Sequence, residues 1–158
     1  MKEINLTQGF KTQVDDLDYH WLNQWKWRVA ITQWGNYAVR TDYSNGKKNI
    51  SMHRVILGLT NPKVQGEHRD RNGLNNQRSN LRPANNQQNS INQVGCNKTS
   101  KYKGVFFDKE RNKFAAQIKV NYKSTFIGRF ISEIDAAIAY DKRAKELFGE
   151  FAYLNFKP

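Results

Sequence analysis

The amino-acid sequence predicts an α+β protein built from two small domains. Short runs of β-forming residues fill the first half, and Asn45-Gly46 lies between two of them, which is a strong hairpin signal. The polar stretch "NQVGCNKTS" (92–100) has no apolar periodicity. Three strand-like runs and one segment with helical spacing follow it. We therefore expect domains at 1–92 and 101–158, joined by a linker at 93–100.

The first fifty residues are expected to form short strands, including the Trp-rich run "YHWLNQWKWRVAITQ" (19–33). We expect the large aromatic side chains to form the core of this layer, with base stacking left as an alternative: Trp21, Trp25, Trp27, Trp34 and Tyr37. The segment "SMHRVILGL" (51–59) changes to a helical period, with Ser51 available as a cap and Pro62 beyond its end. It predicts a short helix.

Residues 64–92 predict a turn-rich hairpin with a helix laid against it. Asn72-Gly73 supplies a turn, and Leu74 and Leu81 are its two buried anchors. Pro83 suits the first turn of a helix through "PANNQQNSIN" (83–92). On that helix three asparagines would share one face: Asn85, Asn89 and Asn92. Four others are expected to be turn or solvent residues: Asn72, Asn75, Asn76 and Asn86.

A disordered asparagine-rich segment is the alternative for the same residues, since nearly coreless polar sequence often stays unfolded. The Leu, Gly and Pro residues favour order, because they lie where an ordered turn and helix need them.

The second half predicts three strands packed on one helix. The strand runs are "YKGVFFD" (102–108), "KFAAQIKV" (113–120) and "KSTFIGRF" (123–130). Ser132 and Asp135 are typical of a capping box, and Gly149 lies where a helix C-cap belongs. Between them the apolar spacing predicts one buried helical face: Ile134, Ala137, Tyr140, Ala144, Leu147 and Phe148.

The chain is strongly basic. It carries 26 Lys and Arg against 14 Asp and Glu, a net charge of +12. Residues 1–92 and 93–158 each contain 13 basic and 7 acidic side chains, so both parts are built to face a polyanion. Nucleic acid is the leading partner, and an anionic membrane is second.

Neither a membrane span nor a signal peptide is expected. No run approaches the roughly 18 apolar residues of a spanning helix. The start, "MKEINLTQGF", lacks the apolar core of a signal peptide, so we expect a soluble, cytoplasmic protein. Cys96 is the single cysteine, which excludes an intramolecular disulfide and zinc sites built on paired cysteines. Any metal would be held by oxygen and imidazole.

The stretch "EHRDRNGLNNQRSNLRPANNQQN" (67–89) resembles the HNH motif of phage and intron-encoded homing endonucleases. The upstream segments "LTQGF", "VDDLDYHWLNQWKW", "YAVR" and "MHRVILGL" resemble the layer that precedes the motif in many phage members. The resemblance covers essentially residues 1–92, and its segments match in the right order. It implies a ββα-metal fold over about 64–92, in an H-N-N variant.

The resemblance also assigns roles to four residues. His68 would be the general base that takes a proton from water, and an imidazole is poised for this near neutral pH. Asn80 would fix the imidazole through its side-chain or backbone oxygen. Glu67 and Asn89 would be oxygen ligands of one Mg²⁺ or Mn²⁺, completed by water and a phosphate oxygen.

Glu67 departs from the family pattern, which commonly has Asp at this position. The extra methylene moves the carboxylate outward by roughly one ångström, a shift that matters for catalytic geometry. An adjusted or weakened site is therefore expected. A surface ion pair is the plain alternative for Glu67 and His68, and motif spacing to Asn80 and Asn89 disfavours it.

Residues 101–157 resemble the APETALA2-type DNA-binding domain, through "KYKGVFF", "KFAAQI", "FIGRF" and "EIDAAIAYDKRAKELFGEFAYLNF". In that family the three-stranded sheet lies in the major groove. Phe106 and Asp108 replace arginines that read guanine, so phosphate contact is expected to dominate. With the basic residues of the HNH motif, the predicted DNA-contacting set is Lys101, Lys103, Lys113, Gln117, Lys119, Lys123, Arg69, Arg71, Arg78 and Arg82.

These resemblances predict a metal-dependent, site-directed DNA endonuclease of the homing type. It would act on double-stranded DNA as a monomer, and one active centre favours nicking, although a dimer could make two cuts. The alternative is a DNA-binding or regulatory protein derived from such an enzyme, with a weakened or inactive metal site.

Overall fold

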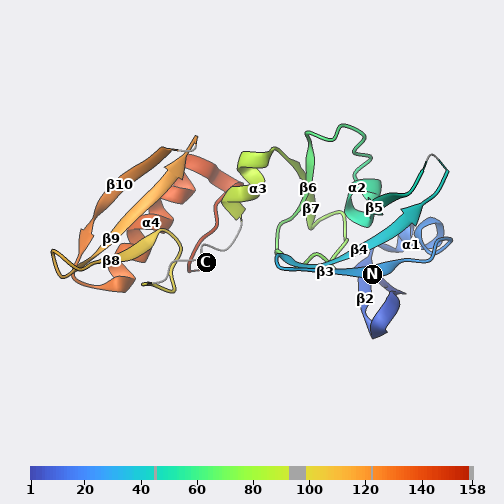
Figure 1. Ribbon diagram of the computed structural model, residues 1–158, viewed down its shortest axis with the longest axis horizontal. Coiled ribbons are helices and arrows are strands. Elements are labelled where there is room, and N and C mark those ends of the chain that lie inside the picture. Colours follow the sequence, from blue (N-terminus) through green and yellow to red (C-terminus); the bar gives the residue numbers. More distant parts are fainter. Residues whose placement is uncertain (45, 93–98, 122, 157–158) are drawn as a thin grey trace. The chain divides into compact units, whose positions relative to one another are not determined.

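The computed structural model describes residues 1–158 except 45, 93–98, 122 and 157–158. The chain forms two compact units, Met1–Asn86 and Gln87–Pro158 (Figure 1). Small sheets and short helices are present in the described parts, so the predicted α+β class is confirmed. The predicted domain boundaries at 92 and 101 stay a prediction, and most of the predicted linker lies outside the described residues.

The first unit begins with an antiparallel strand pair, β1 (Lys2–Asn5) and β2 (Lys11–Val14), joined through the short turn η1 (Thr7–Gly9). Helix α1 (Asp16–Leu22) follows. Its first turn carries Asp16 and Asp18, and acidic side chains there complement the helix dipole.

Helix α1 corrects the prediction that the first fifty residues form only strands. The run 19–33 was expected to be strand, but its first four residues belong to α1, and the next strand begins at Arg28. Leu22 is fully buried on this helix. The aromatic enrichment of the run favoured a strand, but burial of one helical face decides the local structure.

A three-stranded antiparallel sheet comes next, made of β3 (Arg28–Thr32), β4 (Gly35–Asp42) and β5 (Lys48–Ser51) in that order. Asp42 is paired with Lys48, which confirms the hairpin predicted around Asn45-Gly46, with Asn45 itself outside the described residues. Helix α2 (Met52–Ile56) follows directly and confirms the predicted short helix.

The core of the first unit contains only part of the predicted aromatic set. Trp27 is buried and donates from Nε1 to the Leu22 carbonyl at 2.8 Å. Trp25 and Trp34 are instead 39% and 64% exposed, so their placement in the core was wrong. Aliphatic residues fill that space: Ile4, Leu6, Val14, Leu22, Val29, Ala38, Met52, Ile56 and Leu81.

The predicted hairpin is formed by β6 (Gln65–His68) and β7 (Leu81–Ala84), an antiparallel pair in which His68 faces Leu81. Helix α3 (Asn86–Asn92) follows. Pro83 was expected in the first helical turn but lies in β7, exposed. Asn85 consequently precedes the helix. The ββα-metal arrangement of the three elements stays a prediction.

The second unit holds the sheet of β8 (Val105–Asp108), β9 (Lys113–Val120) and β10 (Lys123–Phe130), with β9 in the centre. Helix α4 (Glu133–Phe148) packs on it, and the turn η2 (Gly149–Phe151) follows. The Ser132 hydroxyl accepts from the backbone N–H of Ile134 and Asp135, as predicted for the cap. Gly149 takes a positive φ at the C-terminus of α4.

The buried face of α4 differs from the prediction at three positions, because Ala136 was not predicted to be buried and Ile134 and Leu147 were. Ala136, Ala137, Tyr140 and Ala144 are buried against the sheet, whereas Ile134 and Leu147 are 51% and 39% exposed. The small alanines allow the helix to approach the sheet closely. Among the residues described, no helix is long and apolar enough to cross a bilayer.

Candidate active site

His68 lies at the end of β6 and is 5% exposed. Burial lowers the pKa of its imidazole below the ordinary value, because desolvation disfavours the charged form. The ring is therefore neutral near pH 7. In a neutral imidazole one ring nitrogen carries a proton and the other is basic. The hydrogen-bond partner of the ring determines which of the two nitrogens carries the proton.

Asn76 provides that partner. Its Oδ1 lies 3.2 Å from His68 Nε2, and both side chains are buried. The Asn76 amide nitrogen donates to the Thr12 hydroxyl at 2.8 Å, and that hydroxyl donates to the Leu74 carbonyl at 2.8 Å. The prediction that Asn76 is a turn or solvent residue is wrong, since Asn76 and Thr12 are both 0% exposed.

Backbone hydrogen bonds fasten the loop carrying Asn76 to strand β2. Gln13 donates to the Leu74 carbonyl, and Asn76 donates to the Gln13 carbonyl, each at 2.8 Å. Gly73 allows a close approach on another side, since a Cβ there would lie 2.4 Å from the Asn36 carbonyl oxygen. The loop is thus fixed between β2 and β4.

Asn80 organises the segment that follows His68. Its Oδ1 accepts from the backbone N–H of Asp70 at 3.0 Å, and its Nδ2 donates to Asp70 Oδ1 and to the Asn75 carbonyl, both at 2.8 Å. Its own carbonyl accepts from the N–H of Arg69. These contacts hold the backbone beside His68, and the predicted contact of Asn80 with the imidazole stays a prediction.

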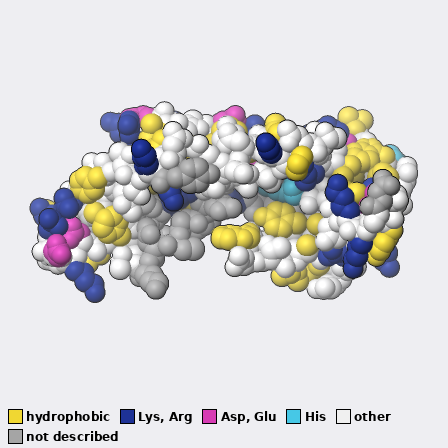
Figure 2. Space-filling view, turned by 45° about the horizontal axis from the view of Figure 1, so that its top comes forward, with side chains coloured by type: hydrophobic (Ala, Val, Ile, Leu, Met, Phe, Trp, Pro, Cys, Tyr) yellow, Lys and Arg dark blue, Asp and Glu magenta, His cyan; other side chains and the backbone are white. Residues whose placement is uncertain are grey.

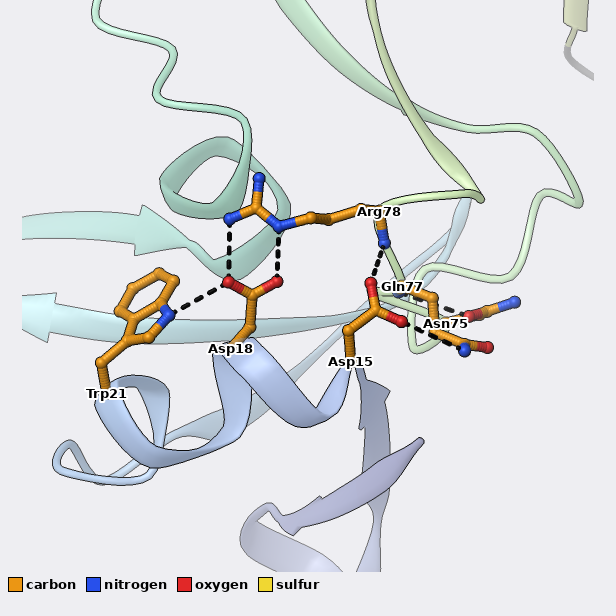
Figure 3. Close-up of polar contacts among 6 residues, drawn as sticks. All are labelled: Asp15, Asp18, Trp21, Asn75, Gln77 and Arg78. Carbon is orange, nitrogen blue, oxygen red and sulfur yellow. Dashed lines mark hydrogen bonds and ion pairs between the residues drawn. The ribbon is translucent and has the colours of Figure 1, made fainter.

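Helix α1 holds the same loop from the other end (Figure 3). Arg78 makes a two-point contact with Asp18, with Nε and Nη2 each 2.8 Å from a carboxylate oxygen. Asp15 accepts from the backbone N–H of Arg78 at 2.8 Å. The Asp18 side chain is buried, so this charge-assisted pair is shielded on one side.

Glu67 forms a buried ion pair with Arg82, its cross-strand partner on β7. Arg82 Nε lies 2.7 Å from Glu67 Oε2, and the two side chains are 6% and 3% exposed. The other carboxylate oxygen, Oε1, is buried and has no hydrogen-bond partner among the described residues. A buried polar atom without a partner is uncommon in folded proteins and needs an explanation, of which a bound ion is one.

Glu67 Oε1 fits one oxygen ligand of a divalent cation. The neighbouring guanidinium of Arg82 opposes cation binding, which favours low affinity in the free protein. In the described ranges no three His, Cys, Asp or Glu side chains gather to hold a metal. The second predicted ligand, Asn89, lies half-buried on α3 in the second unit, and its role with Glu67 stays a prediction.

His53 and Tyr37 complete the surroundings of His68. The His53 and His68 ring centroids are 5.0 Å apart at 77°, and Tyr37 lies 6.0 Å from His68. A Cβ on Gly66 would lie 2.5 Å from the His53 ring, so glycine is required there. Burial, with smaller contributions from the nearby His68 and Arg54, lowers the pKa of His53 to about 3.

The titration of His53 predicts a loss of stability in acid. Below about pH 6.5 the unfolded state binds a proton at this residue and the folded state does not, so the unfolding free energy falls as pH drops towards 3. The slope per such histidine is about 1.4 kcal/mol per pH unit. Urea unfolding of the wild type and His53→Phe between pH 7 and 4 measures it. The variant should show a shallower decline, and parallel curves would contradict the prediction.

The predicted DNA-contacting arginines differ in exposure. Arg69 and Arg71 are exposed on the loop after His68, whereas Arg82 is buried against Glu67 and the fork of Arg78 is bonded to Asp18. Figure 2 shows Lys and Arg side chains on the surfaces of both units.

In the second unit, three predicted DNA-contacting residues share the sheet face opposite α4. Lys113, Gln117 and Lys119 alternate along β9 with Phe114, Ala116 and Ile118, which pack towards the helix. All three are exposed, as are Lys101 and Lys123.

Lys103 lies outside the strands of this sheet. Its ammonium donates to the Ile91 carbonyl at 2.5 Å and lies 5.0 Å from the centre of the Tyr153 ring.

Comparison with known proteins places the chain in a family. It is similar to a protein of Acanthamoeba polyphaga mimivirus named "Uncharacterized HNH endonuclease L560", with 35% identity over 139 residues, which is 85% of this chain and 68% of the relative. The chain belongs to the HNH endonuclease family. No family model matches this HNH chain, and no solved structure matches it.

Sequence reasoning about this HNH protein missed Asn76, Thr12 and His53. Asn76 is one of many asparagines in a polar stretch, and nothing in its spacing separates it from the solvated ones. Thr12 lies in a different segment, and only the pairing of β2 with the loop brings it close. His53 had a local signal, since it lies in the first turn of a helix that was predicted correctly.

Proposed function

We propose that this HNH protein is a DNA endonuclease that hydrolyses phosphodiester bonds, with His68 as the general base and one divalent ion as cofactor. The observation that carries the proposal is the buried imidazole of His68, preceded in β6 by Glu67, whose carboxylate keeps one buried oxygen without a hydrogen-bond partner among the described residues. Phosphodiester hydrolysis needs a proton acceptor for the attacking water and charge stabilisation at the phosphate. His68 supplies the first of these.

The proposed metal ligands are Glu67, through Oε1, and Asn89. Mg²⁺ or Mn²⁺ suits such an oxygen set and, when bound, stabilises charge on the phosphate and the leaving oxygen. The protein contributes the remaining geometry. Asn80 and Asp70 hold the backbone after His68, and Asp18 with Arg78 holds the loop that returns to β7.

DNA binding is assigned to both units. Exposed Arg69 and Arg71 lie in the loop next to His68 and are proposed to contact phosphates. We propose an APETALA2-type role for the second unit, with the sheet face of Lys113, Gln117 and Lys119 on the DNA. The three-stranded antiparallel sheet with one helix on its other face supports this assignment.

The proposed biological role is that of a homing endonuclease acting as a monomer on double-stranded DNA. One His68 in each chain activates one water, so a monomer cuts one strand and leaves a nick. A dimer would make two cuts.

Metal-dependent nicking of DNA tests the proposed function. Supercoiled plasmid and intron-insertion fragments are incubated with the protein in Mg²⁺, in Mn²⁺ or in EDTA. We expect conversion of supercoiled to open-circular DNA with either metal and none with EDTA. Gel analysis measures the product, and a denaturing gel of the labelled fragment shows which strand is cut.

A different result would favour the second candidate, a DNA-binding protein with an inactive metal site. The buried pair of Glu67 and Arg82 favours that candidate, because Arg82 already neutralises the proposed metal ligand. Tight DNA binding without metal-dependent nicking would reject the endonuclease proposal.

A further inference from the structure

The hydrogen bonds that lead to His68 have only one possible direction. The Thr12 hydroxyl lies 2.8 Å from the Leu74 carbonyl oxygen, which can only accept. The single hydroxyl hydrogen of Thr12 is therefore directed to Leu74. Towards Asn76, at 2.8 Å, Thr12 Oγ1 must act as the acceptor.

This direction fixes the orientation of the Asn76 amide. Its Nδ2 faces Thr12 Oγ1 at 2.8 Å and the Gly73 carbonyl oxygen at 3.4 Å, both of which are acceptors. The reversed amide would place Oδ1 against these two oxygens, which is repulsive. Asn76 Oδ1 consequently points to His68 Nε2, 3.2 Å away. Because Oδ1 cannot donate, the proton of the neutral imidazole resides on Nε2.

We propose that Asn76, held by Thr12, is the positioning residue that fixes the Nε2–H tautomer of His68 and makes Nδ1 the basic nitrogen. The assignment of Nδ1 as the base for the water rests on the proposed nuclease function. The tautomer itself does not. It follows from three side chains, all at most 5% exposed, where water cannot replace a lost partner at low cost.

The positioning role separates Asn76 from Asn80. The amide of Asn80 is bonded to Asp70 and to the Asn75 carbonyl, and so fixes the backbone of the loop. The Asn76 side chain is instead bonded to the His68 ring. Strand β2 contacts the site through the Thr12 side chain and the backbone of Gln13, so the N-terminal hairpin helps to orient His68.

Three variants in the full chain test the proposal. Thr12→Val removes the hydroxyl at nearly constant volume, and Thr12→Ser is its matched control because it keeps the hydroxyl. Asn76→Leu removes the acceptor. The readouts are the ¹⁵N chemical shifts of the His68 ring, which report the tautomer in the free protein, and kcat and KM for nicking.

We expect a pure Nε2–H tautomer in the wild type and a mixture in Thr12→Val and Asn76→Leu. Outer partners of this kind typically change activity by about 10- to 100-fold. The loss should appear in kcat with KM nearly unchanged, and Thr12→Ser should keep the wild-type tautomer. Thermal unfolding identifies variants that fail to fold, and Thr12→Val is the milder member of the set.

A His68 ring that is protonated on Nδ1 in the wild type would overturn the proposal. An unchanged tautomer in folded Thr12→Val and Asn76→Leu would also overturn it. If the wild type cuts no DNA but the variants lose the tautomer, the proposed function fails and the positioning role stands. The NMR readout thus separates the two failures.

Discussion

Replacing His68 with alanine is expected to lower the rate of DNA nicking by about 10³-fold, within the 10²- to 10⁴-fold range typical of a positioned general base. The affinity for DNA should stay nearly unchanged. His68 is buried and neutral, so it contributes little to the attraction of phosphates, which is set by exposed Lys and Arg. Single-turnover cleavage and a filter-binding or fluorescence assay at the same salt concentration measure the two effects.

His53→Ala is the matched control for His68→Ala. It removes a second, half-buried imidazole whose ring centre is 5.0 Å from His68 and which has no proposed catalytic role. His53→Ala should cost stability more than rate once the folded fraction is corrected for. Equal losses of cleavage rate in the two folded variants would show that His68 is not the base.

Replacing Arg82 with methionine is expected to lower the unfolding free energy by about 3–5 kcal/mol. The substitution leaves the Glu67 carboxylate buried without its cation, with Oε1 already lacking a hydrogen bond among the described residues. The double variant Glu67→Gln with Arg82→Met should recover most of the loss, because it removes the uncompensated charge. Urea unfolding at pH 7 measures all three proteins.

Arg78→Met is the control for the loss of an arginine. Its Asp18 partner is equally buried, but the Arg78 side chain is 55% exposed, so water can reach the pair. A smaller loss is expected there. The buried-pair interpretation would be refuted by an Arg82→Met loss below about 1 kcal/mol, the upper range of exposed pairs. A double variant no more stable than Arg82→Met would refute it as well.

The same ion pair bears on metal binding. The guanidinium of Arg82 pairs with one carboxylate oxygen of Glu67, the proposed metal ligand. A metal cation must compete with Arg82 for that oxygen or use the other one. The departure from Asp to Glu at position 67 is therefore accompanied by an intramolecular partner that the sequence pattern did not reveal.

Much of the second unit could be predicted because its signals are local. Residues 113–120 and 123–130 were predicted as strands and form β9 and β10 with those bounds. The cap at Ser132 and the end at Gly149 depend only on neighbouring residues. The errors concern which side chains of α4 are buried, as for Ile134 and Leu147. Helical spacing does not specify how closely the sheet packs against the helix.

The first unit shows the same division more sharply. The spacing of His68, Asn80 and Asn89 indicated the family, and the comparison with the mimivirus relative agrees with it. Helix α1 was missed because aromatic residues favour strands when only the local sequence is considered. Its contact with Arg78 joins residues that are about sixty positions apart along the chain. Trp25 and Trp34 were misplaced because hydrophobicity alone does not choose which aromatic ring the core accepts.

The sequence by itself determined the α+β class, the hairpin at 42–48, the helix after Ser51, the strands of the second unit and the HNH motif. Each of these depends on residues that are close along the chain. Only the tertiary structure decided which of the many asparagines touches the imidazole. The hydrogen bond between Asn76 and the imidazole depends on contacts among Thr12, Leu74 and Asn76. These contacts follow from the pairing of β2 with a distant loop. Polar contacts of this kind have no period, so they become visible only when the chain is folded.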